Sequence, residues 1–191
     1  MSVNYWVAFI KIKNRHLFFK YAAPCAETLV HRGHKSQEFV DNLIENISKN
    51  KEIENKCEEN FKVAYAMCRL IAKKKNKKII DDEVLREYYL FNHDEMVDKR
   101  FEQMGDFDPT ECRIYSGEVM SVSENNALIK TILGTKKYKI DYAKDLKIKD
   151  FVTVHRKFVV EKISKTLAKK LYKLKENYFN THPKYDVRVH E

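Results

Sequence analysis

The spacing of apolar residues changes along this chain, from steps of three and four in the first hundred residues to alternation in the second half. Within residues 112–163, apolar positions such as Val152 and Val154 recur with a period of two, and turn-forming clusters such as SENN separate them. This pattern is typical of short strands that each bury one face. We therefore predict a small β-barrel of the OB-like kind over residues 112–163.

Residues 1–105 predict a helical domain, because apolar residues there recur at helical steps. The predicted helices cover about residues 3–21, 36–50, 52–74 and 81–101, with a loop from Pro24 to His34. Ser36 and Asp81 are candidate N-caps. Cys57 and Cys68 lie on the apolar face of the helix over 52–74, so we expect both thiols in the core.

A linker and a final helix complete the predicted organisation. The run MGDFDPTE combines Gly105 and Pro109 with acidic residues, which is typical of a boundary between domains. Ser164 is a candidate N-cap for a last helix with a leucine stripe. The predicted fold class is thus α+β, with a helical domain over 1–105, a barrel over 112–163 and a C-terminal helix over 164–182.

Charge is distributed unevenly over the 191 residues. The net charge is +9, and residues 1–111 hold 19 basic and 19 acidic side chains, so the whole excess lies in residues 112–191. A basic surface of this size favours an acidic partner, either nucleic acid or an acidic protein face.

The chain has four well-separated cysteines and no CxxC pair. It shows neither a secretory signal pattern nor an apolar run of membrane-spanning length. We therefore predict a cytoplasmic protein with reduced thiols and no membrane partner.

Cys25, His31 and His34 form the most chemically crowded cluster of the helical half. Thiolate and imidazole are both zinc ligands, and a nearby imidazolium activates a thiol. The alternative is that Cys25 is a small buried residue and that both histidines are solvated, because their spacing matches no metal motif. This cluster is a secondary candidate site, and a cysteine-dependent enzyme built on it is the third functional hypothesis.

The predicted barrel supports two functions. An oligonucleotide-binding surface needs lysines for phosphates and aromatic residues for bases, and Lys136, Lys137 and Lys139 are candidates for the first role. Alternatively, Cys112 and His155 lie at strand termini, where a barrel could bring them to one rim. There they could bind a soft metal or form a nucleophile–base pair.

Around Cys112 and His155, residues 112–163 resemble the hydrogenase-maturation chaperone family HypC/HupF. Its members open with Cys, three residues, Pro-Gly and a valine strand, where this chain has CRIYSGEV. Further on they have Gly-Asp-aromatic-Val-x-Val-His and a Phe-Ala-Ile-Glu-Lys-like strand, where this chain has KDFVTVH and FVVEKI. Cys112 is internal, Ser116 replaces Pro and Lys149 replaces Gly. A looser similarity links the whole chain to proteins encoded near hydrogenase genes, which have helices before such a barrel.

The resemblance implies a HypC-like barrel and a non-enzymatic chaperone in [NiFe]-hydrogenase maturation. It implies that Cys112 ligates iron transiently, as part of an Fe(CN)2CO fragment, with His155 beside it. It also implies a protein partner, either another maturation factor or a metalloenzyme precursor. A nucleic-acid-binding module that uses the basic barrel and the last helix is the alternative function.

Overall fold

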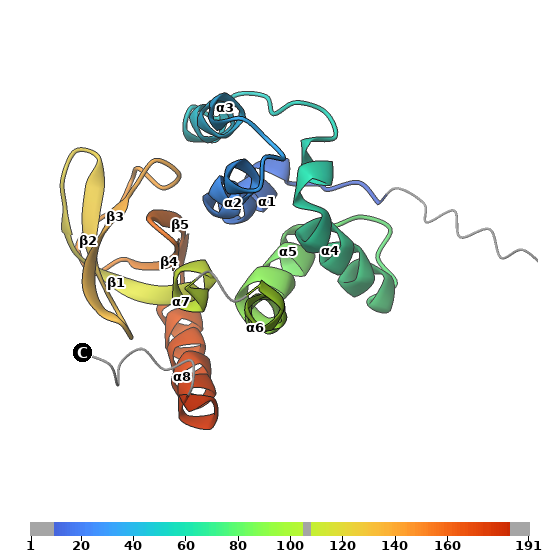
Figure 1. Cartoon of the computed structure of the whole chain (residues 1–191). Coiled ribbons are helices and arrows are strands. Elements are labelled where there is room, and N and C mark those ends of the chain that lie inside the picture. Colours follow the sequence, from blue (N-terminus) through green and yellow to red (C-terminus); the bar gives the residue numbers. More distant parts are fainter. Residues whose placement is uncertain (1–9, 105–107, 184–191) are drawn as a thin grey trace, which may run out of the picture.

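The computed structural model describes residues 10–104 and 108–183, in which helices precede a five-stranded sheet and one final helix follows it (Figure 1). This order confirms the predicted α+β class. The helical elements are α1 (Arg15–Ala22), η1 (Ala23–Cys25), α2 (Glu27–His31), α3 (Gln37–Ser48), η2 (Cys57–Phe61), α4 (Lys62–Lys74), α5 (Asp82–Glu87), the π-helical turn η3 (Tyr88–Asn92), α6 (His93–Met104), α7 (Pro109–Cys112) and α8 (Lys165–Thr181).

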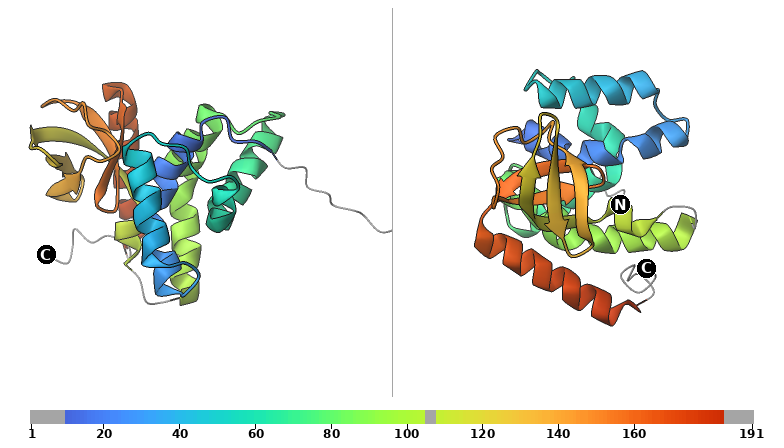
Figure 2. Two further views of the ribbon diagram at one scale, coloured as in Figure 1. Left: turned by 90° about the horizontal axis from the view of Figure 1, so that it is seen from above. Right: turned by 90° about the vertical axis from the view of Figure 1, so that its left-hand side faces the viewer.

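The sheet contains β1 (Ile114–Val122), β2 (Asn126–Thr131), β3 (Gly134–Lys139), β4 (Phe151–His155) and β5 (Phe158–Ile163). Its strand order is β1-β2-β3-β5-β4, and β1 also pairs antiparallel with β4, so the order returns to its start. In this sheet, β3 and β5 pair in parallel, through Lys139 and Phe158, and the other described strand pairs are antiparallel. In the right-hand view of Figure 2, the red helix α8 lies below the sheet and the light-blue helix α3 lies above it.

Gly117 permits the close approach of β1 and β2. A Cβ atom at this position would lie 2.4 Å from Cγ2 of Ile129 and 2.9 Å from the carbonyl oxygen of Lys130. Because a backbone oxygen cannot move aside without breaking the strand pairing, any larger residue would separate the two strands.

The apolar core has two parts. The first packs the helices together and includes four residues that follow the helical half, Ile114, Tyr142, Phe158 and Val160. The second fills the inside of the sheet and includes Phe179 of α8. The helices and the sheet therefore share buried apolar surface, which fixes the position of one against the other.

The structure corrects three of the predicted boundaries. Of the predicted helix over 3–21, residues 3–9 lie outside the described part, Ile12 forms a parallel bridge with Ile80, and α1 begins only at Arg15. The predicted loop from Pro24 to His34 contains η1 and α2. Cys112 ends the short helix α7 and does not open the first strand.

The predicted helix over 52–74 is also too long. Lys56 has a left-handed backbone with φ of 61°, which a helix cannot include, and a short 3-10 segment then precedes α4. Cys57 and Cys68 are 4% and 0% exposed, so their prediction as core residues is confirmed.

The three predicted N-caps are confirmed by their side-chain hydrogen bonds. Ser36, Asp81 and Ser164 each accept a hydrogen bond from the backbone amide three residues later. These contacts satisfy amide groups that have no partner within the helix, so they fix where α3, α5 and α8 begin.

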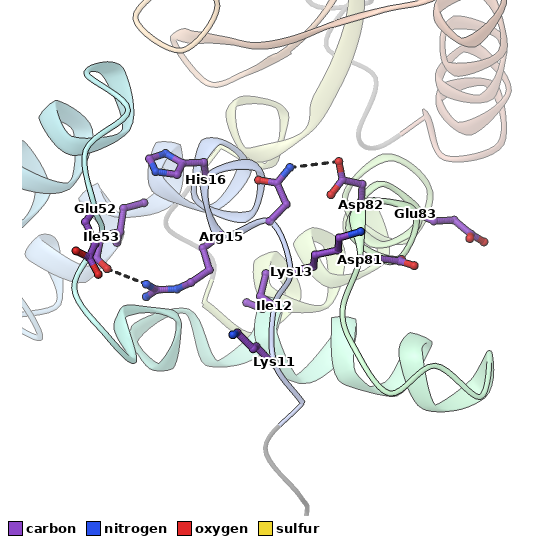
Figure 3. A pocket seen from close by; sticks show the side chains of 11 residues that line it. Lys11, Ile12, Lys13, Arg15, His16, Glu52, Ile53, Asp81, Asp82 and Glu83 are labelled. Atoms are coloured by element: carbon purple, nitrogen blue, oxygen red, sulfur yellow. Dashed lines mark hydrogen bonds between the residues drawn. The ribbon is translucent and has the colours of Figure 1, made fainter.

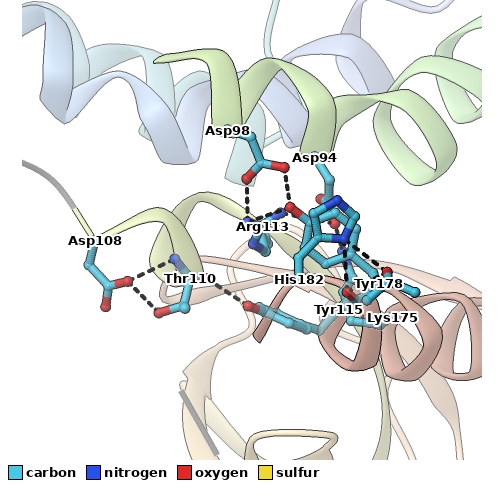
Figure 4. Close-up of polar contacts among 10 residues, drawn as sticks. Asp94, Asp98, Asp108, Thr110, Arg113, Tyr115, Lys175, Tyr178 and His182 are labelled. Atoms are coloured by element: carbon cyan, nitrogen blue, oxygen red, sulfur yellow. Dashed lines mark hydrogen bonds and ion pairs between the residues drawn. The ribbon is translucent and has the colours of Figure 1, made fainter. Parts of the chain in front are cut away.

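A fully buried arginine connects α6, β1 and α8 (Figure 4). The guanidinium of Arg113 lies 2.5 Å from an oxygen of Asp98 and 3.4 Å from an oxygen of Asp94. It also lies over the ring of Tyr178, 4.5 Å from the centroid. Lys175 adds a second positive charge by pairing with Asp94. Opposite charges are thus distributed through one buried network.

We expect Arg113→Met to lower the free energy of unfolding by roughly 3 kcal/mol, because it leaves Asp98 without its buried cation. Urea denaturation followed by circular dichroism measures the loss. The matched control is Lys99→Met on α6, whose pair with Glu95 is exposed and contributes about 0.5 kcal/mol or less. Equal losses in the two variants would contradict a stabilising role for the buried network.

Candidate functional site: a cysteine and histidine pocket

A cavity of about 420 Å³ lies where the helices meet the sheet. Residues of α1, α2, α4, η3 and α6 line one side of it, and Cys112 and His155 line the other. Cys25, from the end of η1, also contributes to the wall. Two of the four cysteines therefore meet a histidine in a single pocket.

Cys25 and His155 form a direct contact. The Cys25 Sγ lies 3.2 Å from Nε2 of His155, and Nδ1 of the same ring lies 2.8 Å from the carbonyl oxygen of Tyr21. A carbonyl can only accept a hydrogen bond, so Nδ1 carries the ring proton when the imidazole is neutral. Nε2 is then an acceptor, and the Cys25 thiol donates to it.

Cys112 completes the group of sulfur and nitrogen atoms. Its thiol lies close enough to Cys25 to change the pKa of that residue, and the Nη1 atom of Arg156 lies 3.8 Å from its sulfur. Arg156 also pairs with Glu111 at 3.3 Å, which helps to hold the guanidinium beside Cys112. Two thiols, one imidazole and one permanent positive charge therefore lie together.

These contacts separate the acidities of the cysteines. The hydrogen bond from Cys112 lowers the pKa of Cys25 against the opposing effect of burial, and the positive charge of Arg156 lowers it further. The same hydrogen bond, followed by burial, raises the pKa of Cys112. Burial also raises the pKa of Cys57 to about 11. Cys25 is therefore the more acidic thiol of the pocket.

The fold brings His155 to Cys25 through two sets of contacts. In the first, His155 ends β4 and pairs with Ile114 of β1, which places it beside Cys112 two residues earlier.

In the second, the Tyr21 hydroxyl of α1 donates to Glu161 of β5 at 2.5 Å and lies 3.2 Å from the Thr153 hydroxyl. Arg86 of α5 pairs with the same Glu161 at 2.8 Å. These bonds hold the end of α1 against the sheet. Cys25 ends η1, the next element along the chain, so the same bonds also position its thiol.

Two buried polar atoms in the pocket wall have no hydrogen-bond partner within the described residues. They are the hydroxyl oxygen of Tyr89, which is 2% exposed, and Nδ1 of His93, which is 9% exposed. A buried polar group without a partner costs free energy, and a bound ligand is one way to offset that cost. Tyr89 lies within the π-helical turn η3 and His93 comes directly after it, and such turns often occur at functional sites.

The structure brings four of the predicted site residues into one pocket. Cys112 and His155 line one pocket, and Cys25, from the secondary cluster, lies between them. His34 lines the same pocket, whereas His31 is exposed and contributes nothing to its wall. The predicted role of Cys112 and His155 in metal binding stays a prediction. Sequence reasoning missed the contact between Cys25 and His155, because nothing in the local pattern of either segment points to the other.

Lys136, Lys137 and Lys139 lie on β3 with exposed side chains. Lys139 approaches the ring of Phe158, with Nζ 5.8 Å from the centroid. These lysines do not line the pocket of the cysteines. Their predicted role in partner or nucleic-acid contact stays a prediction.

A second hollow, of about 710 Å³, lies where the start of α1 meets α5 (Figure 3). Its charged groups bind other parts of the protein: Arg15 donates to the carbonyl oxygen of Ile53 at 2.7 Å, and Asn14 donates to Asp82 at 3.2 Å. These contacts hold the start of α1 against neighbouring segments. The cysteine and histidine pocket is the better candidate because it brings two thiols and an imidazole together.

The pocket offers two sulfur atoms and one imidazole nitrogen as possible metal ligands. Two thiols and an imidazole suit a soft or borderline ion. Among the described residues, however, no group of three or more His, Cys, Asp or Glu side chains is arranged to hold a metal ion. Arg156 also places a positive charge beside Cys112.

No protein-family model matches the chain, and no curated protein matches it. The resemblance to HypC/HupF thus depends on the residues quoted above. In the described part of the chain, no helix combines the length and apolar character needed to cross a bilayer.

We expect the free energy of unfolding to fall as the pH is lowered from 6.5 to 4. Burial lowers the pKa of His155 from 6.5 to about 4, so in this window the unfolded chain binds a proton that the folded chain excludes. The loss reaches on the order of 3 kcal/mol for this imidazole. Urea denaturation of His155→Gln should give a flatter pH dependence, while the exposed control His31→Gln should follow the unmodified protein. Parallel curves for His155→Gln and the unmodified protein would contradict the assignment.

Proposed function

We propose that this protein is a non-enzymatic accessory factor for metalloenzyme assembly, which holds a small cargo in the cysteine and histidine pocket and passes it to a protein partner. The observation that carries this proposal is the meeting of Cys25, Cys112 and His155 in one cavity. Such a pocket offers two sulfur ligands and a group that can hold or release their protons.

The backbone around the quoted motifs supports the resemblance to HypC/HupF. Where the family has Pro-Gly, Gly117 has no room for a Cβ atom, and the Ser116 hydroxyl donates to the carbonyl oxygen of Ala168 in α8 at 2.9 Å. Where the family has Gly-Asp, Lys149 has φ of 72°, a conformation that favours glycine. The sheet order, which returns from β4 to β1, is consistent with an OB-like or HypC-like barrel.

The pocket favours a cargo that brings its own ligands. A metal fragment of the Fe(CN)2CO kind needs only one or two protein sulfurs, because its other positions are already filled. Its cyanide groups accept hydrogen bonds and carry negative charge. The Tyr89 hydroxyl and Arg100 in the pocket wall supply a donor and a positive charge of the matching kind.

We expect Cys112→Ala and Cys25→Ala each to remove most of the iron that co-purifies from a hydrogenase-producing host. Metal analysis and infrared bands of bound cyanide and carbon monoxide measure the loss. Circular dichroism should show an unchanged fold for both variants. The control Cys57→Ala lies outside the pocket and should keep the iron while losing about 1 kcal/mol of stability through lost packing. If Cys112→Ala and Cys25→Ala keep full iron and partner binding, the proposed function is wrong.

Nucleic-acid binding is the second candidate, and the exposed lysines on one hairpin favour it. Lys136 and Lys137 of β3 lie exposed across from Ile129 and Leu128 of β2, and Lys130 is exposed on the neighbouring strand. A cluster of this kind can follow a phosphate backbone.

If this alternative holds, affinity for an oligonucleotide should fall steeply with salt, with a log–log slope near −0.9 per duplex phosphate neutralised. Our preferred function predicts only weak association. The decisive comparison is Lys136→Ala/Lys137→Ala/Lys139→Ala against Lys73→Ala/Lys74→Ala/Lys78→Ala, which removes equal charge from another exposed region. Binding with a dissociation constant below about 1 μM at physiological salt that is lost only in the first variant would favour nucleic-acid binding as the function.

A further inference from the structure

Cys25 and Cys112 come from separate halves of the chain, yet both line one pocket, and each thiol changes the pKa of the other. Cys25 is partly exposed and borders the pocket, whereas Cys112 is 7% exposed behind it. One thiol therefore faces incoming reagents and the other lies directly beside it. A reactive cysteine next to a resolving cysteine is the arrangement of a reversible redox pair.

We propose that Cys25 is a site of oxidation by hydroperoxides and that its product is an intramolecular disulfide with Cys112. This inference does not depend on the proposed function. It follows from the shared pocket of the two sulfurs, from the base beside one of them and from the arginine beside the other.

The first step uses the contact between Cys25 and His155. Nε2 of His155, 3.2 Å from Sγ, accepts the thiol proton. The Cys25 sulfur then attacks one oxygen of the hydroperoxide, so that an S–O bond forms and the O–O bond breaks. The departing oxygen takes the proton and leaves as water or an alcohol, and Cys25 becomes a sulfenic acid.

The second step uses Cys112. Its sulfur attacks the Cys25 sulfur, an S–S bond forms, and the S–O bond breaks. Hydroxide leaves with the proton of Cys112 as water. The two thiols have lost two electrons in all, and the hydroperoxide has gained them. The guanidinium of Arg156, whose Nη1 lies 3.8 Å from the Cys112 sulfur, stabilises negative charge on that sulfur as it attacks.

The other two cysteines provide internal controls. Cys57 and Cys68 are 4% and 0% exposed, and neither lines the pocket. Cys68 lies within the apolar core of the helical half, so a polar oxidant has no route to it without local opening. Selective oxidation of Cys25 therefore distinguishes the pocket from general thiol damage.

The test treats the full-length protein with equimolar hydrogen peroxide, blocks the remaining thiols with N-ethylmaleimide after unfolding, and maps the cysteines by mass spectrometry without reduction. We expect a peptide pair that joins Cys25 to Cys112 and separates on reduction. In Cys112→Ser, Cys25 should stop at a sulfenic acid that dimedone traps. In Cys25→Ser, Cys112 should remain reduced. His155→Gln should slow the reaction by at least roughly tenfold, whereas Cys57→Ser should leave it unchanged.

Circular dichroism checks that each variant keeps its fold before oxidation. Three outcomes would overturn the proposal: no linked Cys25–Cys112 peptide, oxidation of Cys57 or Cys68 at the same rate as Cys25, or an unchanged rate in His155→Gln. Iron binding plays no part in this experiment. A failure here would therefore leave the proposed function untouched, and loss of the proposed function would leave the redox pair standing.

Discussion

The burial of the Arg113 charge is the constraint on which the arrangement of the two halves depends. A guanidinium that is fully removed from water needs its opposite charges close by, and these come from Asp94 and Asp98 of α6. Tyr178 of α8 covers the same group, so α6, the start of β1 and α8 must meet at one point. Cys112 directly precedes this arginine, and the charge network therefore also positions the pocket.

The pocket is thus a property of the interface between the helices and the sheet. One thiol follows α1, the other precedes β1, and the imidazole ends β4. The bonds from Tyr21 to Thr153 and Glu161 fix the distance between these elements. The two unpartnered polar atoms, on Tyr89 and His93, come from the same interface. Because each half supplies only part of the donor set, neither half contains the site alone.

Features that depend on local rules could be predicted from the sequence. The caps at Ser36 and Ser164 follow from one side chain and one nearby amide, and β4 follows from the alternation in VTVH. The features that could not be predicted depend on partners far along the chain. Ile12 pairs with Ile80 across the helical half, and the contact of Cys25 with His155 requires both halves to be folded. The complete burial of Arg113 runs against the usual exposure of arginine.

His155 lies at the end of β4, so it is synthesised much later than Cys25. Cys25 leaves the ribosome long before the strand that carries its base, so in the growing chain its thiol has neither His155 nor Cys112 beside it. The contact can form only when β4 has paired with β1 and the sheet has closed against α1. The environment of Cys25 can therefore form only after both halves of the chain have been synthesised.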